Sequence, residues 1–168
     1  INEPSDMAGL KIRVMKSPLM VNTVNAMGGS ATPMAYGELY TALQQGVLDG
    51  GENAAGNVLN DKFFEVSKYY SITQHFRPPG VVAMSKKTWD SLSSKQQKAI
   101  KKAAAELQEY EIDLTTEVVN NAMKSLESKG MIVNKANVPA FAEAVKPVYK
   151  SYSDKYGSGD IDAILNTK

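Results

Sequence analysis

Arg13 is the first residue of this sequence whose type and position suit ligand binding. The alternation of apolar and polar residues over 10–14 predicts a strand, and Ser17-Pro18 then leads into a helix. In open α/β sheets, ligands bind beyond the carboxyl ends of the strands, where helix N-termini offer unpaired N–H donors. A guanidinium at that edge can hold a carboxylate through two parallel hydrogen bonds. The alternative is an exposed arginine in a surface ion pair.

A second polar cluster follows the short apolar stretch at 47–48. Gly50 and Gly51 permit backbone angles that other residues resist, and they direct Glu52 and Asn53 to the same strand-end edge. The amide of Asn53 both donates and accepts, which suits a ligand hydroxyl or carboxylate. The alternative is an ordinary turn in which the asparagine caps a helix.

Two further candidates have strong structural alternatives. Tyr36 and Glu38 stand at an expected helix start after Pro33, where they can equally be a core aromatic and a carboxylate favoured by the helix dipole. His75 is the sole histidine, and its type favours a hydrogen-bonded packing role over proton transfer.

The composition disfavours several function classes. The 168 residues are 43% hydrophobic and 22% charged, with a net charge of +1, which indicates a folded chain and disfavours nucleic-acid binding. With no cysteine and one histidine, a zinc site or thiol nucleophile is unsupported. No phosphate-binding glycine motif, nucleophile elbow or membrane-spanning apolar run occurs. We therefore expect no catalytic residue, metal, cofactor, nucleic-acid partner or transmembrane segment.

Hydrophobic periodicity in the first half predicts a parallel α/β architecture. Helices are expected over 18–27, 36–45 and 53–59, with extended segments at 31–34 and 47–51 between them. This alternation with the strand at 10–14 is typical of a parallel sheet. Before it, 5–9 predicts a capped turn with Ser5 as N-cap. A chain that enters a strand so early, without an apolar leader, is expected to be a piece of a longer protein.

The second half is dominated by one long helix. Strands are expected at 69–73 and 80–84 and a short helix at 86–92. Ser93 and Gln96 then form a capping-box pattern, and apolar residues recur by threes and fours until Gly130.

The remaining residues predict three more elements. These are a return strand at 131–133, a helix over 138–156 bent at Pro147, and a terminal helix over 160–165.

Ordered motifs along the chain resemble one family. The segments GLKIRV at 9–14 and ATPMAYGELYTALQQGVLDG at 31–50, followed by Glu52-Asn53, are similar to the DctP-like solute-binding subunits of tripartite ATP-independent periplasmic (TRAP) transporters. The resemblance continues through 63–66, Thr73-x-His75 and Ser85, so it covers essentially the whole chain.

The resemblance implies a two-lobed periplasmic-binding-protein-like α/β fold, of which this chain is the later part. Residues 1–78 would form the core of the second lobe with the ligand-contacting loops. Residues 79–130 would hold a hinge-return strand and the helices that end in a long lobe-spanning helix. Residues 131–168 would supply a return strand and C-terminal helices packed on the lobes.

It also implies roles for individual residues. Arg13 corresponds to the arginine that pairs with the ligand carboxylate, and Asn53 to an asparagine that hydrogen-bonds the ligand. Tyr36 would line the pocket and Ser17 would add a polar contact. Glu52, and with it Glu38, would touch the ligand or order the arginine and its loop.

The function implied is capture of a small organic acid in the periplasm, after removal of a signal peptide, and delivery to TRAP membrane permease subunits. The stretch at 13–18 favours a sugar acid such as a hexuronate, with a C4-dicarboxylate or another organic acid as the alternative. Two other classes stay open: an α/β enzyme that uses His75 with Glu38 or Glu52, and a helical interaction module built on the long helix.

Overall fold

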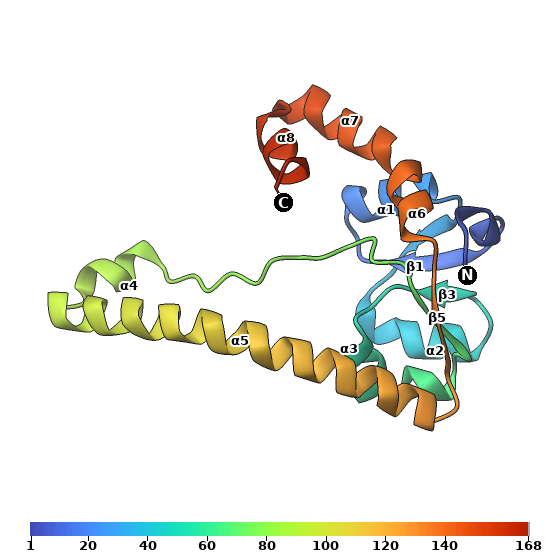
Figure 1. The fold of residues 1–168 in the computed structure, drawn as a ribbon, viewed down its shortest axis with the longest axis horizontal. Coiled ribbons are helices and arrows are strands. Elements are labelled where there is room, and N and C mark those ends of the chain that lie inside the picture. The colour runs from blue at the N-terminus through green and yellow to red at the C-terminus, as the bar shows by residue number, and fades with distance from the viewer. Residues whose placement is uncertain (168) are drawn as a thin grey trace.

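A three-stranded parallel sheet forms the centre of the chain, in a computed structural model that describes residues 1–167 (Figure 1). The order is β2-β1-β3, with β1 (Lys11–Val14) between β2 (Ser30–Pro33) and β3 (Gly50–Gly51). Within it, Arg13 is paired with Thr32 on one side and Gly51 on the other. The predicted strand at 10–14 and the parallel arrangement are confirmed.

One hydrophobic core lies between this sheet and helices from both ends of the chain. The 3-10 turn η1 (Pro4–Met7) precedes β1, and α1 (Pro18–Ala26) follows it. The C-terminal helices α6 (Val138–Ala144) and α7 (Lys146–Tyr156) pack on the same side, and α8 (Gly159–Leu165) then folds back from α7 (Figure 1). The fully buried side chains of this core include Val14, Met20, Val24 and Phe141.

A second hydrophobic core is formed by other helices of the chain. It is formed by α2 (Leu39–Gln44), α3 (Ala55–Asn60) and the 3-10 turn η3 (Phe63–Glu65), which pack near the C-terminal end of the long helix α5 (Ser94–Ser128). Leu126 of α5 is fully buried there, against a cluster that includes Leu39 and Phe63. The expected helix over 36–45 begins as a 3-10 turn, η2 (Tyr36–Glu38), before α2.

A separate two-stranded sheet joins distant parts of the sequence. β4 (Tyr69–Ile72) pairs in parallel with β5 (Ile132–Lys135), so that Tyr70 lies opposite Val133. The Ser71 hydroxyl donates to Asn134 Oδ1 at 2.8 Å across the pair. Because β5 follows α5 in the sequence, this pairing holds the C-terminal end of α5 close to residues 69–72.

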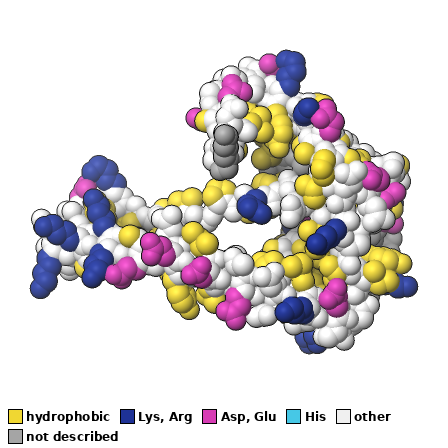
Figure 2. All heavy atoms as spheres, viewed as in Figure 1, with side chains coloured by type: hydrophobic (Ala, Val, Ile, Leu, Met, Phe, Trp, Pro, Cys, Tyr) yellow, Lys and Arg dark blue, Asp and Glu magenta, His cyan; other side chains and the backbone are white. Residues whose placement is uncertain are grey.

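α4 (Lys86–Ser91) and the first turns of α5 form an arm that projects from the rest of the chain (Figure 1). The predicted capping box is confirmed, because Ser93 N donates to Gln96 Oε1 at 2.8 Å and Gln96 N to Ser93 Oγ at 3.4 Å. Apolar residues along the arm are exposed, as with Leu107 at 46%. Lysines gather at its tip (Figure 2): Lys86, Lys87, Lys95, Lys98, Lys101 and Lys102, all exposed.

Three local predictions are wrong in detail. Residues 80–84 form no strand; no described strand pairs with them, and Val81 and Val82 are 81% and 82% exposed. The first turn is capped by Asp6 Oδ2, which accepts from the amides of residues 2 and 3, because Pro4 favours the first helical position and moves the start upstream of Ser5.

The third concerns 138–156, which is two helices meeting at Val145 and not one bent helix. Pro147 has no amide hydrogen to bond the carbonyl of Glu143, and its ring would clash with that carbonyl in a continuous helix. The chain therefore restarts as α7, with the proline in its first turn.

We expect Leu126→Ala to lower the free energy of unfolding by about 2–5 kcal/mol, because it leaves a cavity where α5 meets the second core. Leu107→Ala makes the same chemical change on the same helix at an exposed position, and should change stability by less than about 0.5 kcal/mol. Urea denaturation followed by circular dichroism measures both. Equal losses in the two variants would contradict the described packing of α5.

Candidate functional site

Arg13 is buried, with 5% of its surface exposed, and its guanidinium is held by backbone. Its Nε and Nη2 both donate to the carbonyl of Met34, at 3.0 and 2.9 Å. Its Cζ lies 5.5 Å from the centre of the Tyr36 ring, close enough for a cation–π contact. Among the described residues no carboxylate forms an ion pair with it. The remaining N–H donors of the fork are therefore available for an anion.

Tyr36 lies at the centre of a polar network beside this arginine. Its hydroxyl donates to Asp61 Oδ2 and accepts from Asn53 Nδ2 at 2.9 Å. Burial, and then the hydrogen bond to Asp61, raises the pKa of Tyr36 to about 12, while Asn53 and Arg13 act in the opposite direction. The ring is thus fixed in position by its own hydroxyl, with one face toward Arg13.

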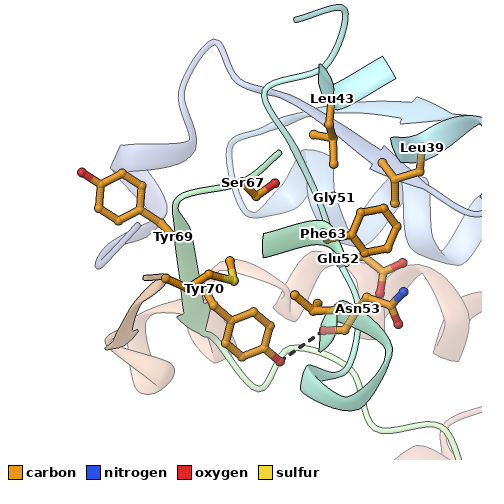
Figure 3. A pocket seen from close by; sticks show the side chains of 11 residues that line it. Leu39, Leu43, Gly51, Glu52, Asn53, Phe63, Ser67, Tyr69 and Tyr70 are labelled. Carbon is orange, nitrogen blue, oxygen red and sulfur yellow. Dashed lines mark hydrogen bonds between the residues drawn. The ribbon is translucent and has the colours of Figure 1, made fainter. Parts of the chain in front are cut away.

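Asn53 lies just before α3 and accepts three hydrogen bonds there. Its Oδ1 accepts from the amide of Ala54 at 2.9 Å and from Asn57 Nδ2 at 2.7 Å. Its own carbonyl accepts from the Tyr70 hydroxyl at 3.2 Å, the bond dashed in Figure 3. The structure therefore combines both readings of this residue: Asn53 orders the helix start and lies in the cleft with Arg13 and Tyr36.

Glu52 lies directly after β3, next to Asn53 (Figure 3). Burial raises the pKa of its carboxyl, and the positive charge of Arg13 partly offsets that shift. Gly51, the residue before it, sits tightly in the sheet, because a Cβ there would approach Leu39 Cδ1 to 3.2 Å. The absence of a side chain lets Leu39 and the stem of Arg13 fill that space.

The other two sequence candidates lie apart from this cluster. Ser17 is the N-cap of α1, and neither it nor Glu38 is among the residues that line the cleft. The Ser17 hydroxyl makes no hydrogen bond to another described residue. Glu38 Oε2 accepts from the amide of Ala35 at 3.2 Å, so this carboxylate caps the turn that positions Tyr36.

A cleft of about 1070 Å³ opens in front of Arg13, Tyr36, Glu52 and Asn53. β4 and residues of the segment after it, as far as Pro78, also line the cleft. Glu52 and Asn53 also line a much smaller cavity of about 60 Å³, shown in Figure 3. The small cavity has space for water molecules only, so the cleft is the candidate binding site.

His75 is a cleft residue that sequence reasoning assigned to packing. Its Nδ1 lies 2.6 Å from Thr73 Oγ1, and its Nε2 is buried without a hydrogen-bond partner among the described residues. Burial lowers its pKa, which favours the neutral imidazole. His75 contributes to the lining of the cleft, but its Nε2 is itself buried and does not face the open space.

Sequence reasoning also missed the residues that hold the cluster together. Asp61, Asn57 and Tyr70 each bond Tyr36 or Asn53, although none follows a strand or belongs to a motif. The spacing of Asn53 and Asn57, four residues apart around a helix start, was the one available signal.

Neither a cluster of metal-ligating side chains nor a membrane-spanning helix occurs among the described residues. Within 1–167, no group of three or more histidine, cysteine or carboxylate side chains gathers where it could hold a metal ion. In the same part of the chain, none of the helices has the length and apolar character needed to cross a bilayer.

Residues 1–155 match the protein family described as bacterial extracellular solute-binding protein, family 7, also named DctP. This match spans most of the chain. The chain belongs to the DctP family. The resemblance seen in the sequence motifs is thereby confirmed.

Relatives and solved structures agree with this membership. A solute-binding protein of Chromohalobacter salexigens is 35% identical over 93% of this chain and 47% of its own length. A TRAP periplasmic solute-binding protein of Sulfitobacter sp., with bound β-D-galacturonate, has a TM-score of 0.86 at 41% identity, covering 93% of this chain and 52% of that one. Another from Pseudomonas putida, with bound D-glucuronate, has a TM-score of 0.91 at 34% identity, covering 100% and 55%.

The DctP-family chain described here thus spans about half the length of these relatives. Its α/β fold is that of the corresponding half of a TRAP periplasmic binding protein, which confirms the expected fold class. The family and these neighbours are solute-binding proteins, which favours binding over the enzymatic use of His75.

The raised pKa of Tyr36 predicts a pH-dependent loss of stability in this DctP-family chain. Between pH 10 and 12 the unfolded tyrosine loses its proton while the folded one keeps it, so stability falls as pH rises through that window. Tyr36→Phe removes this contribution, and the variant's stability should fall less steeply from pH 10 to 12. Denaturant unfolding at several pH values measures the slopes. Parallel curves for the two proteins would contradict the network around the Tyr36 hydroxyl.

Proposed function

We propose that this chain supplies one wall of the ligand cleft in a periplasmic solute-binding subunit of a TRAP transporter. The ligand is a small sugar acid of the hexuronate kind, and the subunit delivers it to the transporter's membrane permease. The observation that carries the proposal is Arg13, which lines the cleft and whose guanidinium is buried, is fixed by the Met34 carbonyl and forms no ion pair with a described residue. The two solved relatives with bound hexuronates support the choice of ligand.

Arg13 would hold the carboxylate of the acid through charge-assisted hydrogen bonds. Asn53 and Glu52 would contact hydroxyl groups of the same ligand, and Tyr36 would form the wall beside the carboxylate. Ser17, on the loop after β1, would contribute a polar contact only if the bound ligand reaches beyond the residues that line the cleft here.

One arginine is not sufficient for tight binding. A bidentate charge-assisted pair contributes about 1.5–3 kcal/mol net, whereas micromolar affinity requires about 8 kcal/mol. The rest must come from polar contacts on both sides of the ligand and from exclusion of water when the cleft closes. Arg13 therefore determines the orientation of the ligand more than its total affinity.

Replacement of this arginine is the direct test. We expect Arg13→Ala to weaken binding of D-galacturonate and D-glucuronate to the full-length protein by about ten- to hundredfold. Arg77→Ala is the matched control, because Arg77 is the other arginine of the chain, is exposed and does not line the cleft. Isothermal titration calorimetry measures both variants. Unchanged affinity in the first variant, with its fold intact, would exclude the proposed carboxylate anchor.

The 168-residue chain alone should bind these acids far more weakly than the full-length protein, because one wall leaves the ligand exposed to water on its other side. The same titration on the two proteins tests this. Equal affinities would show that the cleft described here is complete by itself, and would overturn the proposed role as one wall of two.

A further inference from the structure

The lysine-rich tip, residues 86–102, concentrates positive charge at one end of the molecule. Six lysines against one aspartate give this segment a charge of +5, whereas the whole chain carries +1. All six lysines are exposed, and they gather where the arm ends (Figure 2). A local charge of this size attracts anions even though the chain as a whole is nearly neutral.

The placement of these lysines opposes the stability of their own helix. Lys95 lies in the first turn of α5 and Lys98 at the start of the second, and that first turn holds no acidic residue. The N-terminal end of a helix carries a partial positive charge, so it is stabilised by carboxylates and destabilised by lysines. Local folding therefore does not explain the lysines, whereas an external partner of negative charge would.

Half of the six lysines have no charged partner within the chain. Two of the others form exposed ion pairs with carboxylates four residues further along, and Lys101 Nζ lies 5.6 Å from the centre of the Trp89 ring. Lys87, Lys95 and Lys98 form no ion pair with any other described residue. Because unpaired lysines are almost never fully buried, the rest of the full-length protein would cover the apolar residues of the arm and leave these ammonium groups in water.

The chemistry of the tip favours a plane of negative charge over a shaped acidic partner. Residues 86–102 contain no arginine, and lysine is a hydrated point charge without the planar fork that binds one carboxylate or phosphate by two hydrogen bonds. The tip lines neither the cleft nor the small cavity. Clusters of about four to eight basic residues on a helix bind anionic lipid headgroups in this diffuse way.

We propose that the lysine-rich tip is a docking surface for the anionic phospholipid headgroups of a bilayer. Attachment is peripheral, through the lysine ammonium groups and lipid phosphates, and it reverses when salt screens the charges. The inference goes beyond the proposed function, because no residue of the ligand cleft takes part in it. It would hold the subunit at the membrane surface while its cleft remains free to bind an acid.

Vesicle co-sedimentation of the full-length protein tests the proposal. The probes are vesicles of phosphatidylcholine alone and of phosphatidylcholine with about one third phosphatidylglycerol. We expect binding to the anionic vesicles at about 50 mM NaCl, at least about tenfold weaker binding at about 300 mM, and little binding to the neutral vesicles. Equal binding to both kinds of vesicle, or none to either, would overturn the proposal.

A triple substitution tests whether the tip is the surface that binds. Lys87→Gln, Lys95→Gln and Lys98→Gln together remove three charges that have no ion-pair partner among the described residues, and glutamine is a good helix former. The triple variant should bind anionic vesicles at least about tenfold more weakly than the wild type. If it fails to fold by circular dichroism, the three single variants decide, each with an expected loss of about two- to fivefold.

The matched control makes the same change of net charge away from the tip. It combines Lys11→Gln, Lys124→Gln and Lys135→Gln, three exposed lysines on β1, the C-terminal part of α5 and β5. We expect its vesicle binding to stay within about twofold of the wild type. Equal losses in the two triple variants would mean that net charge and not the tip governs binding, and would overturn the proposal.

Two further results keep the alternatives apart. A wild-type protein that ignores anionic vesicles but is retarded by poly-L-glutamate in native electrophoresis would show a preference for an acidic chain, and would also overturn the proposal. Calorimetry with D-galacturonate on the same proteins reports the cleft separately, and both triple variants should bind it as the wild type does. Failure of the wild type to bind any acid would refute the proposed function and leave the vesicle result to be judged by itself.

Discussion

The buried guanidinium of Arg13 is the constraint around which the site is arranged. A charge taken out of water is costly unless hydrogen bonds and opposite charge compensate it. Here the compensation comes from three elements that meet at one edge: the end of β2 through the Met34 carbonyl, η2 through the ring of Tyr36, and the residue after β3 through the charge of Glu52. Movement of any of them would leave the charge less compensated.

The same constraint extends from the sheet to α3. Because Tyr36 faces the guanidinium and bonds both Asp61 and Asn53, the start and the end of α3 are tied to the arginine through one phenol. The amide group of Asn53 is in turn fixed by Ala54 and Asn57. Polar groups fixed before the ligand arrives lose less conformational entropy on binding, which is what a binding site requires.

The sequence was most informative where local patterns determine local structure. The alternation around Arg13, the Ser93–Gln96 capping box and the apolar stripe up to Gly130 each predicted an element that the structure contains. It was least informative for contacts between distant residues. The pairing of β4 with β5 and the bond from Tyr36 to Asp61 depend on the tertiary fold, and no periodicity encodes them. The strand expected at 80–84 failed for the same reason, since a valine-rich segment becomes a strand only beside a partner.

The lysine-rich tip of the arm makes the chain electrically lopsided although its net charge is only +1. Residues 86–102 hold six lysines and a single aspartate, whereas residues 103–128, the remaining turns of α5, hold six carboxylates and one lysine. The molecule therefore has a large dipole moment along the arm. An external field or a charged matrix orients the molecule through this dipole more strongly than it attracts the small net charge. On an ion exchanger such a chain would be retained through its tip by a cation-exchange resin and through the later turns of α5 by an anion-exchange resin, at the same pH.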